Sequence, residues 1–175
     1  MKKRTVSFGT IIAAAVLLSP GHVLANQFVT GSSSNVNVTL NSSANWVTIR
    51  SVTVTIPAAD ALTHGCVATA SADMAYGGPS GVENQYWFVL SRNNANPLTN
   101  TGSERMLELV DNTTVNDPDS KPVSTTQHFT GLTKTNGANG GGSHTFYFLG
   151  RKVTAGTATA DVLDASLSVS CIHTP

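Results

Sequence analysis

Short runs in which apolar and polar residues alternate constrain this chain most strongly. From Val36 to Leu40 every second residue is apolar, and the same period of two returns between Ala165 and Cys171. Such alternation places one set of side chains on a core and the other in solvent, as in a half-buried β-strand. No window carries the i, i+3, i+4, i+7 apolar stripe of a helix, so the sequence predicts an all-β protein.

Six further runs have the composition of strands and are separated by turns rich in Gly, Pro and Asn. They span residues 46–56, 64–72, 85–92, 105–110, 123–132 and 143–153. In the run 46–56 the apolar residues change from odd to even positions, which predicts a β-bulge or a bend near Arg50 and Ser51. The run 123–132 is polar enough to be an edge strand. We expect the core to include Phe88, Leu90, Phe146, Phe148, Leu167 and Val169.

About eight short strands without intervening helices predict a single two-sheet β-sandwich over residues 26–175. A cysteine on an early strand and another on the last strand favour a jelly-roll-like topology, in which the final strand returns beside the early ones. An immunoglobulin-like sandwich is the less favoured alternative, because no tryptophan stands at the spacing that backs the immunoglobulin disulfide.

The first 25 residues have the layout of a bacterial-type secretory signal peptide. Lys2, Lys3 and Arg4 precede an apolar run at residues 11–18, and Ala25 lies next to the expected cleavage site. The apolar run is shorter than the roughly 20 residues that span a bilayer, so we expect no membrane span after cleavage. The sequence therefore predicts a secreted, periplasmic or cell-surface protein.

Cys66 and Cys171 are the two cysteines of the chain. Oxidising compartments preserve disulfides, so an exported chain with two cysteines is expected to pair them. Two free thiols are the alternative. A zinc role is disfavoured because neither cysteine belongs to a CxxC or Cys-His cluster.

Removal of the leader leaves seven basic against ten acidic residues, a net charge of −3. Nucleic-acid binding rests on basic side chains that neutralise phosphates, so this composition excludes a nucleic-acid partner. No catalytic motif is present. The carboxylates of Asp73, Glu83 and Glu108 are isolated in the sequence, which leaves a two-carboxylate hydrolase open without supporting it.

Two aromatic residues and one acidic loop are the candidate binding features. Trp46 precedes a strand and Tyr76 precedes a Gly-Gly-Pro stretch, so we expect both rings to be more exposed than the other aromatic candidates. Packing at the rim of the core is the favoured role for them, and stacking on a ligand such as a glycan is the alternative. Trp87 and Tyr147, in runs that are apolar on both sides, are expected in the core. The oxygen-rich loop at 111–119 suggests a calcium site. Its candidate ligands are Asp111, Asp117 and Asp119.

Three functional classes follow from these features. The favoured class is an exported, non-catalytic binding or surface-interaction module, whose partner is a glycan or another surface protein. The first alternative is a structural subunit of a surface appendage or coat, which oligomerises through its sheet edges. The second alternative is a small secreted hydrolase. No cofactor other than calcium is indicated.

Overall fold

The structure, a computed structural model, describes residues 28–34, 37–41, 45–77, 83–97, 105–110, 119–153 and 159–174. The predicted leader lies outside these residues, so the signal peptide stays a prediction. The elements of the described part are β1 (Phe28–Ser34), β2 (Val38–Leu40), β3 (Val47–Thr55), β4 (His64–Gly77), β5 (Glu83–Arg92), β6 (Arg105–Val110), β7 (Asp119–Leu132), the 3₁₀ turn η1 (Ala138–Gly140), β8 (Ser143–Lys152) and β9 (Thr159–His173).

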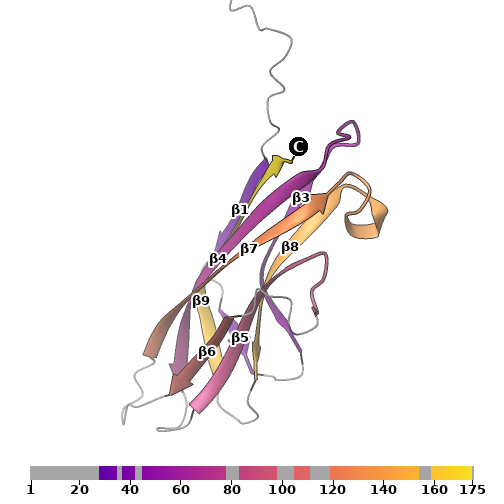
Figure 1. Cartoon of the computed structure of the whole chain (residues 1–175). Coiled ribbons are helices and arrows are strands. Elements are labelled where there is room, and N and C mark those ends of the chain that lie inside the picture. The colour runs from indigo at the N-terminus through magenta and orange to yellow at the C-terminus, as the bar shows by residue number, and fades with distance from the viewer. Residues whose placement is uncertain are drawn as a thin grey trace, which may run out of the picture.

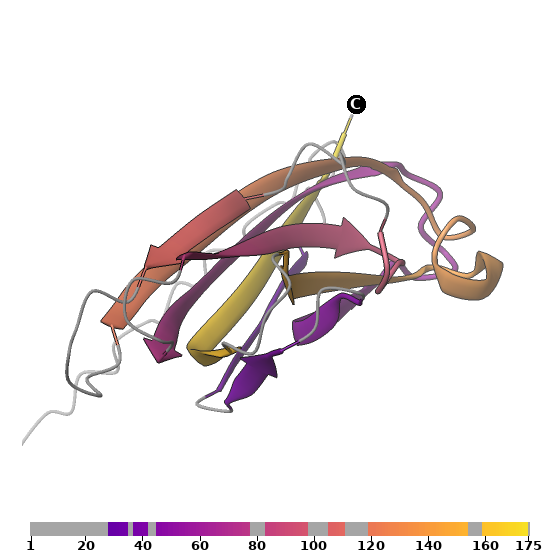
Figure 2. The ribbon, with the colours of Figure 1, turned by 90° about the horizontal axis from the view of Figure 1, so that it is seen from below.

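The strands form two antiparallel sheets that pack face to face (Figures 1 and 2). In the first sheet the order is β1-β9-β4-β7, and β2 also pairs with β9. In the second sheet it is β3-β8-β5-β6. β1 and β2 pair with successive parts of β9, so together they fill one strand position. Within the described residues no helix is long and apolar enough to cross a membrane.

The strand order is that of an eight-position jelly roll. From β3 onward the chain crosses repeatedly from one sheet to the other. β4, β7 and β9 belong to the first sheet, and β3, β5, β6 and β8 belong to the second. The last strand lies between the first strand position and β4, as the cysteine positions predicted. Cys66 on β4 faces Cys171 on β9 in direct register, and their sulfurs are bonded. The predicted disulfide-closed β-sandwich is confirmed.

The predicted bulge lies in β3. Its register against β8 shifts between Thr48 and Arg50, so the neighbours Ile49 and Arg50 are both buried. The extra residue moves Val52 and Val54 onto the inner face, because a one-residue shift reverses which side chains face the core. A buried Arg50 then lies between the sheets, where its Nε donates to the carbonyl oxygen of Ala165 at 3.1 Å.

The core between the sheets combines small and large side chains. The inner face of β4 carries alanines at every second position, while β5 and β8 supply the rings of Phe88 and Phe148, whose centroids are 6.0 Å apart. Phe129 of β7 meets Phe146 of β8 edge-on at 5.3 Å, which links the two sheets. All six residues predicted to form the core are buried: Phe88, Leu90, Phe146, Phe148, Leu167 and Val169.

Candidate functional site

Tyr76 lies in β4, and the prediction that its ring is exposed in a loop is wrong. The alternation of inward residues along β4 continues through Met74 to Tyr76, which is fully buried. Its hydroxyl accepts a hydrogen bond from Asn84 Nδ2 at 2.7 Å, and its ring meets Tyr86 edge-on at 6.4 Å. Burial, and then the neighbouring Tyr76, raise the pKa of Tyr86. A buried ring offers no face on which a ligand can stack.

Lys152 extends this polar end of the core and was missed by the sequence reasoning. It lies opposite Tyr86 in the ladder between β5 and β8 and is almost fully buried. Burial lowers the pKa of its ammonium group, because desolvation penalises the charged form. The alternation in β8 could have predicted this burial, because Lys152 is separated by an even number of residues from the inward-facing Phe146 and Phe148.

Trp46 belongs to a stack of three side chains on the outer face of the second sheet. The guanidinium carbon of Arg151 lies 4.7 Å from the ring centroid of Trp46 and 4.7 Å from that of Trp87. The indole Nε1 of Trp46 donates to the carbonyl oxygen of Pro97 at 3.0 Å. All three side chains are half-buried. The stack therefore fixes the residues before β3 against the sheet by cation–π contact.

Trp87 and Tyr147 are not in the core as predicted, since both are half-buried on the outer face of the second sheet. Their strands do carry apolar residues on both faces. However, the residues that face the core are Tyr86 and Phe88 on β5, and Phe146 and Phe148 on β8.

The predicted calcium ligands Asp111 and Asp117 lie outside the described residues, and Asp119 is the first residue of β7. The calcium site therefore stays a prediction. The structure does show the strand ends on either side of residues 111–118. Asp119 pairs with Tyr76, and Val110 pairs with Glu83. The ends of β4, β5, β6 and β7 next to these residues therefore lie at the same end of the sandwich. Within the described ranges no group of three or more His, Cys, Asp or Glu side chains is arranged to hold a metal ion.

Asp73 is separated from the other two isolated acidic residues. Asp73 is exposed on β4 of the first sheet, whereas Glu83 and Glu108 belong to β5 and β6 of the second. Side chains that leave the outer face of one sheet cannot face strands of the other. Asp73 therefore cannot form a catalytic pair with either glutamate.

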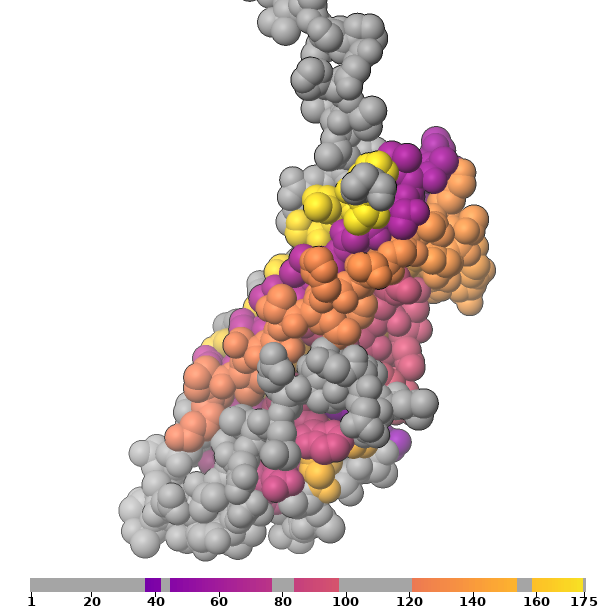
Figure 3. Space-filling model, viewed as in Figure 1, coloured from indigo at the N-terminus to yellow at the C-terminus, as the bar shows by residue number. Residues whose placement is uncertain are grey.

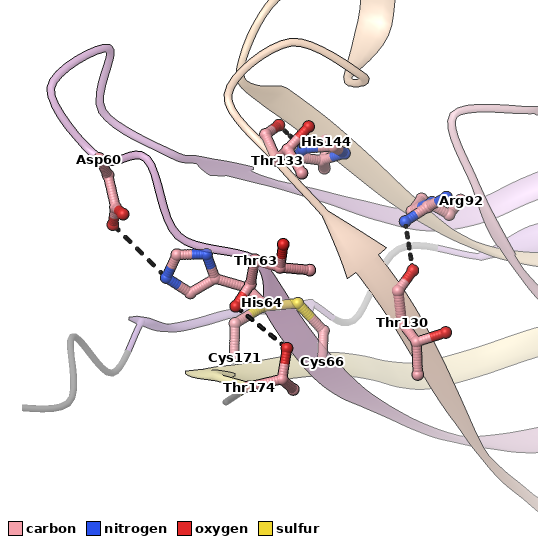
Figure 4. The surroundings of a disulfide bond; sticks show 10 residues. All are labelled: Asp60, Thr63, His64, Cys66, Arg92, Thr130, Thr133, His144, Cys171 and Thr174. Atoms are coloured by element: carbon pink, nitrogen blue, oxygen red, sulfur yellow. Dashed lines mark hydrogen bonds and ion pairs between the residues drawn. A yellow bond between two sulfur atoms is a disulfide. The ribbon is translucent and has the colours of Figure 1, made fainter.

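Histidines surround the disulfide at the opposite end of the sandwich (Figure 4). His64 Nε2 lies 3.5 Å from Asp60 Oδ2, and its ring centroid is 6.2 Å from that of His173. The two histidines lie opposite each other in the ladder between β4 and β9. His64 is fully buried, so this carboxylate–imidazole pair has no open path to a substrate.

His144 is a second buried imidazole near the disulfide. Its Nε2 lies 2.9 Å from the carbonyl oxygen of Thr133. Burial lowers the pKa of His144, and the charges of Arg92 and His64 lower it further, although the hydrogen bond to Thr133 partly opposes this. The group is therefore held neutral inside the fold, as a structural side chain rather than an acid or base in solution.

The outer face of the first sheet carries rows of hydroxyl groups. The Oγ1 atoms of Thr69 and Thr126 are 3.3 Å apart, and the Oγ atoms of Ser71 and Ser166 are 2.8 Å apart. Near the disulfide end this face contains a shallow groove of about 170 Å³. It is lined by Gly65, Val67, His128, Thr130, Ser170, Ile172 and Thr174.

β7 forms one edge of the first sheet and is 14 residues long. It pairs with β4 on one side, and within the described part of the chain no strand pairs with its other side. In Figure 3 its orange side chains run as a continuous band across the surface. Between Lys121 and Leu132 the strand contains no acidic or basic residue other than His128.

These features define a disulfide-closed jelly-roll domain in which the long strand β7 forms one edge of the first sheet. The sequence matches no protein-family model and no curated protein. Among solved structures the chain is similar to the crystal structure of an infectious bursal disease virus VP2 subviral particle, with 13% identity and a TM-score of 0.36. It is also similar to the structure of T=1 particles derived from infectious bursal virus, with 12% identity and a TM-score of 0.22.

The two similarities cover 92% of this chain in each case. They cover 38% and 44% of the other chains, so this chain spans less than half the length of either. Neither similarity bears on function.

Proposed function

We propose that this chain is an exported, non-catalytic structural subunit that assembles through an edge of its first sheet. The observation that carries the proposal is that β7, at the edge of the first sheet, has a strand neighbour on one side only among the described residues. An unpaired strand presents a row of backbone donors and acceptors that can hydrogen-bond to another chain. The disulfide supports export, because oxidising compartments preserve such bonds and the cytosol reduces them.

The two edges of the second sheet, β3 and β6, are less suited to assembly. On β3, the side chain of Arg50 reaches across to the carbonyl oxygen of Ala165 on β9, which ties the two sheets together along that side. β6 is six residues long and contains Arg105 and Glu108. Short, charged or covered edges are those that proteins protect from pairing. β7 is longer, and its residues 123–129 include no Asp, Glu, Lys, Arg or Pro.

Export and assembly can be tested on one preparation. The full chain is expressed in a bacterium, and the periplasmic and secreted fractions are purified without reductant. We expect a product that begins at Asn26 by intact mass, and light scattering that shows association across the micromolar range. An unprocessed cytosolic product would contradict export, and a monomer at every concentration would contradict the structural role.

A binding module is the second candidate, and the half-buried stack of Trp46, Arg151 and Trp87 favours it. Aromatic faces at the surface are suited to sugar rings, so a glycan screen of the wild type and of Trp46→Ala tests this proposal. Calcium binding at the 111–119 loop is tested by the melting temperature in EDTA and in millimolar calcium. Retention of no glycan, and an unchanged melting temperature, would exclude these ligands.

A further inference from the structure

The hairpin between β7 and β8 contains the only two Asn-Gly pairs of the sequence, Asn136-Gly137 and Asn139-Gly140. An asparagine that precedes glycine is prone to lose its side-chain amide, because glycine has no side chain to hinder attack by its backbone nitrogen. Both asparagine side chains are exposed. Sequence and exposure therefore make the two pairs equivalent, and only their hydrogen bonds and backbone surroundings distinguish them.

Asn136 is held at both ends of its side-chain amide. Its Oδ1 accepts a hydrogen bond from the backbone N–H of Thr133 at 2.8 Å, and its Nδ2 donates to the carbonyl oxygen of Gly131 at 2.7 Å. The backbone nitrogen of Gly137, which would have to attack this amide, donates to the carbonyl oxygen of Gly141 at 2.7 Å. A reaction at Asn136 must therefore break three hydrogen bonds.

The backbone of Gly137 is also enclosed by its surroundings. A Cβ atom placed on Gly137 would collide with the carbonyl oxygens of Ser143 and Gly141. At Gly140 the nearest described atom beyond the chain neighbours is the carbonyl oxygen of Thr135, at 4.0 Å from such a Cβ atom. The backbone at Gly140 therefore has space to rotate, whereas the backbone at Gly137 does not.

Asn139 is the middle residue of the turn η1 and is held less firmly. Its backbone lies in the left-handed region, with φ 56° and ψ 27°, which asparagine tolerates but does not favour. The backbone nitrogen of Gly140 donates to the carbonyl oxygen of Gly137 at 3.2 Å, at the long end of the usual range. Within the described part of the chain, no group forms a hydrogen bond with the side-chain amide of Asn139.

We propose that Asn139 is a site of spontaneous deamidation in the folded protein, and that the fold protects Asn136 from the same reaction. At ψ 27° the nitrogen of Gly140 points away from the Asn139 side chain, so the peptide between them must first rotate. Such rotation is a local opening of the turn, which costs least where few contacts oppose it. The hydrogen bonds and the open space at Gly140 therefore direct the reaction to Asn139.

The reaction requires only hydroxide and water. Hydroxide removes the proton from the Gly140 nitrogen, which bonds to Cγ of Asn139. The bond between Cγ and Nδ2 breaks, Nδ2 takes a proton from water and leaves as ammonia, and a five-membered cyclic imide remains. Water then adds to one of the two imide carbonyl groups, and the bond from that carbonyl carbon to the Gly140 nitrogen breaks. The product is an aspartate or an isoaspartate, whose backbone passes through Cβ.

The two asparagines can be compared within one molecule. Trypsin cleaves after Lys134 and after Arg151, so a single peptide contains both sites, and fragmentation in the mass spectrometer measures each separately. The folded protein is incubated in mildly alkaline buffer, and a sample taken at the start corrects for conversion during digestion. We expect Asn139 to convert at least about tenfold faster than Asn136, because opening at Asn136 breaks two additional side-chain hydrogen bonds.

Urea supplies the first control, because it removes the structure and leaves the sequence unchanged. In the unfolded chain both asparagines lose their hydrogen bonds, so their rates should become similar. Asn139→Gln supplies the second control. Glutamine keeps the amide, but its extra methylene group requires a six-membered ring, which closes more slowly. Each deamidation adds one negative charge, so ion-exchange chromatography of the folded variant should show no accumulation of the more acidic form.

Selective conversion of Asn139 in the folded protein, loss of that selectivity in urea and a stable charge in Asn139→Gln together support the proposal. Equal conversion of the two asparagines in the folded protein, or faster conversion of Asn136, overturns it. Conversion of Asn139 in urea but not in the folded protein also overturns it, because the turn would then be protective. The same holds if neither site converts in either state, or if Asn139→Gln becomes acidic at the wild-type rate.

Discussion

Removal of the Cys66–Cys171 disulfide should destabilise the protein mainly through its unfolded state. The bond joins residues that are 105 apart in sequence. A cross-link that closes a loop of roughly 100 residues contributes about 4.7 kcal/mol in the loop-entropy model, and native disulfides in small exported domains contribute about 2–5 kcal/mol. In the folded protein the ladder between β4 and β9 runs from His64 opposite His173 to Gly77 opposite Thr159. The backbone therefore keeps these strands in register without the bond.

We expect the double variant Cys66→Ala/Cys171→Ala to lose about 2–5 kcal/mol of unfolding free energy. The m-value should rise, because an unfolded chain without the cross-link is more expanded and exposes more surface. Urea titration monitored by tryptophan fluorescence measures the free energy of unfolding and the m-value. The near-ultraviolet circular dichroism of the folded variant should match that of the wild type.

The reduced wild type separates the cross-link from packing. The reduced protein retains both buried sulfur atoms and loses only the bond between them. The difference in unfolding free energy between the reduced protein and the double variant therefore measures the cost of the space that the sulfur atoms leave. A loss below about 1 kcal/mol with an unchanged m-value would refute the reasoning, since the loop term predicts several times that amount. Both cysteines are fully buried, so reduction requires prior unfolding in denaturant.

Three further outcomes are expected. Phe88→Ala should lower the unfolding free energy by about 3–5 kcal/mol in urea titrations, because Phe88 is fully buried between the sheets; a loss below about 1 kcal/mol would contradict that packing. Burial lowers the pKa of the His144 imidazole, so this side chain binds a proton more readily in the unfolded chain than in the folded protein. The free energy of unfolding should therefore be highest above the ordinary histidine pKa of about 6.5 and should decrease as the pH falls below it. His144→Gln should flatten the melting temperature between about pH 7.5 and 5.5, and an unaltered profile would assign the effect to other groups. Arg151→Met should shift the emission of the only two tryptophans and cost about 1 kcal/mol, whereas identical spectra would argue against the stack.

The sequence was sufficient for the strands whose side chains alternate clearly. The alternation of apolar residues predicted the bulge near Arg50 and the inward-facing residues around Phe88, and polar composition predicted the edge position of β7. The two cysteines predicted which strands are neighbours. These features depend on local periodicity or on one covalent constraint, and both can be read without knowledge of the sheet order.

Other features required information that the sequence does not carry locally. β1 has apolar residues only at Phe28 and Val29 before a Gly-Ser stretch, so no alternation marked it. Because a Gly-Gly-Pro stretch follows Tyr76, the strand was predicted to end too early. Tyr76, a candidate for ligand stacking, was therefore assigned to a loop although it lies within β4. The stack around Arg151 depends on Trp87 lying opposite it in the ladder between β5 and β8, which only the register determines.

The position of the disulfide also determines how the chain would respond to mechanical force. Tension applied between Phe28 and His173 can peel away β1, β2 and β3, and then it passes from Cys66 directly to Cys171. Once those strands are peeled, residues 67–170 carry no load while the bond is intact. Extension would therefore stop after about 130 Å, at roughly 3.4 Å per residue for the chain between Phe28 and Cys66. A subunit built this way would lengthen under strain by a fixed amount and keep β5 to β8 closed within a covalent loop.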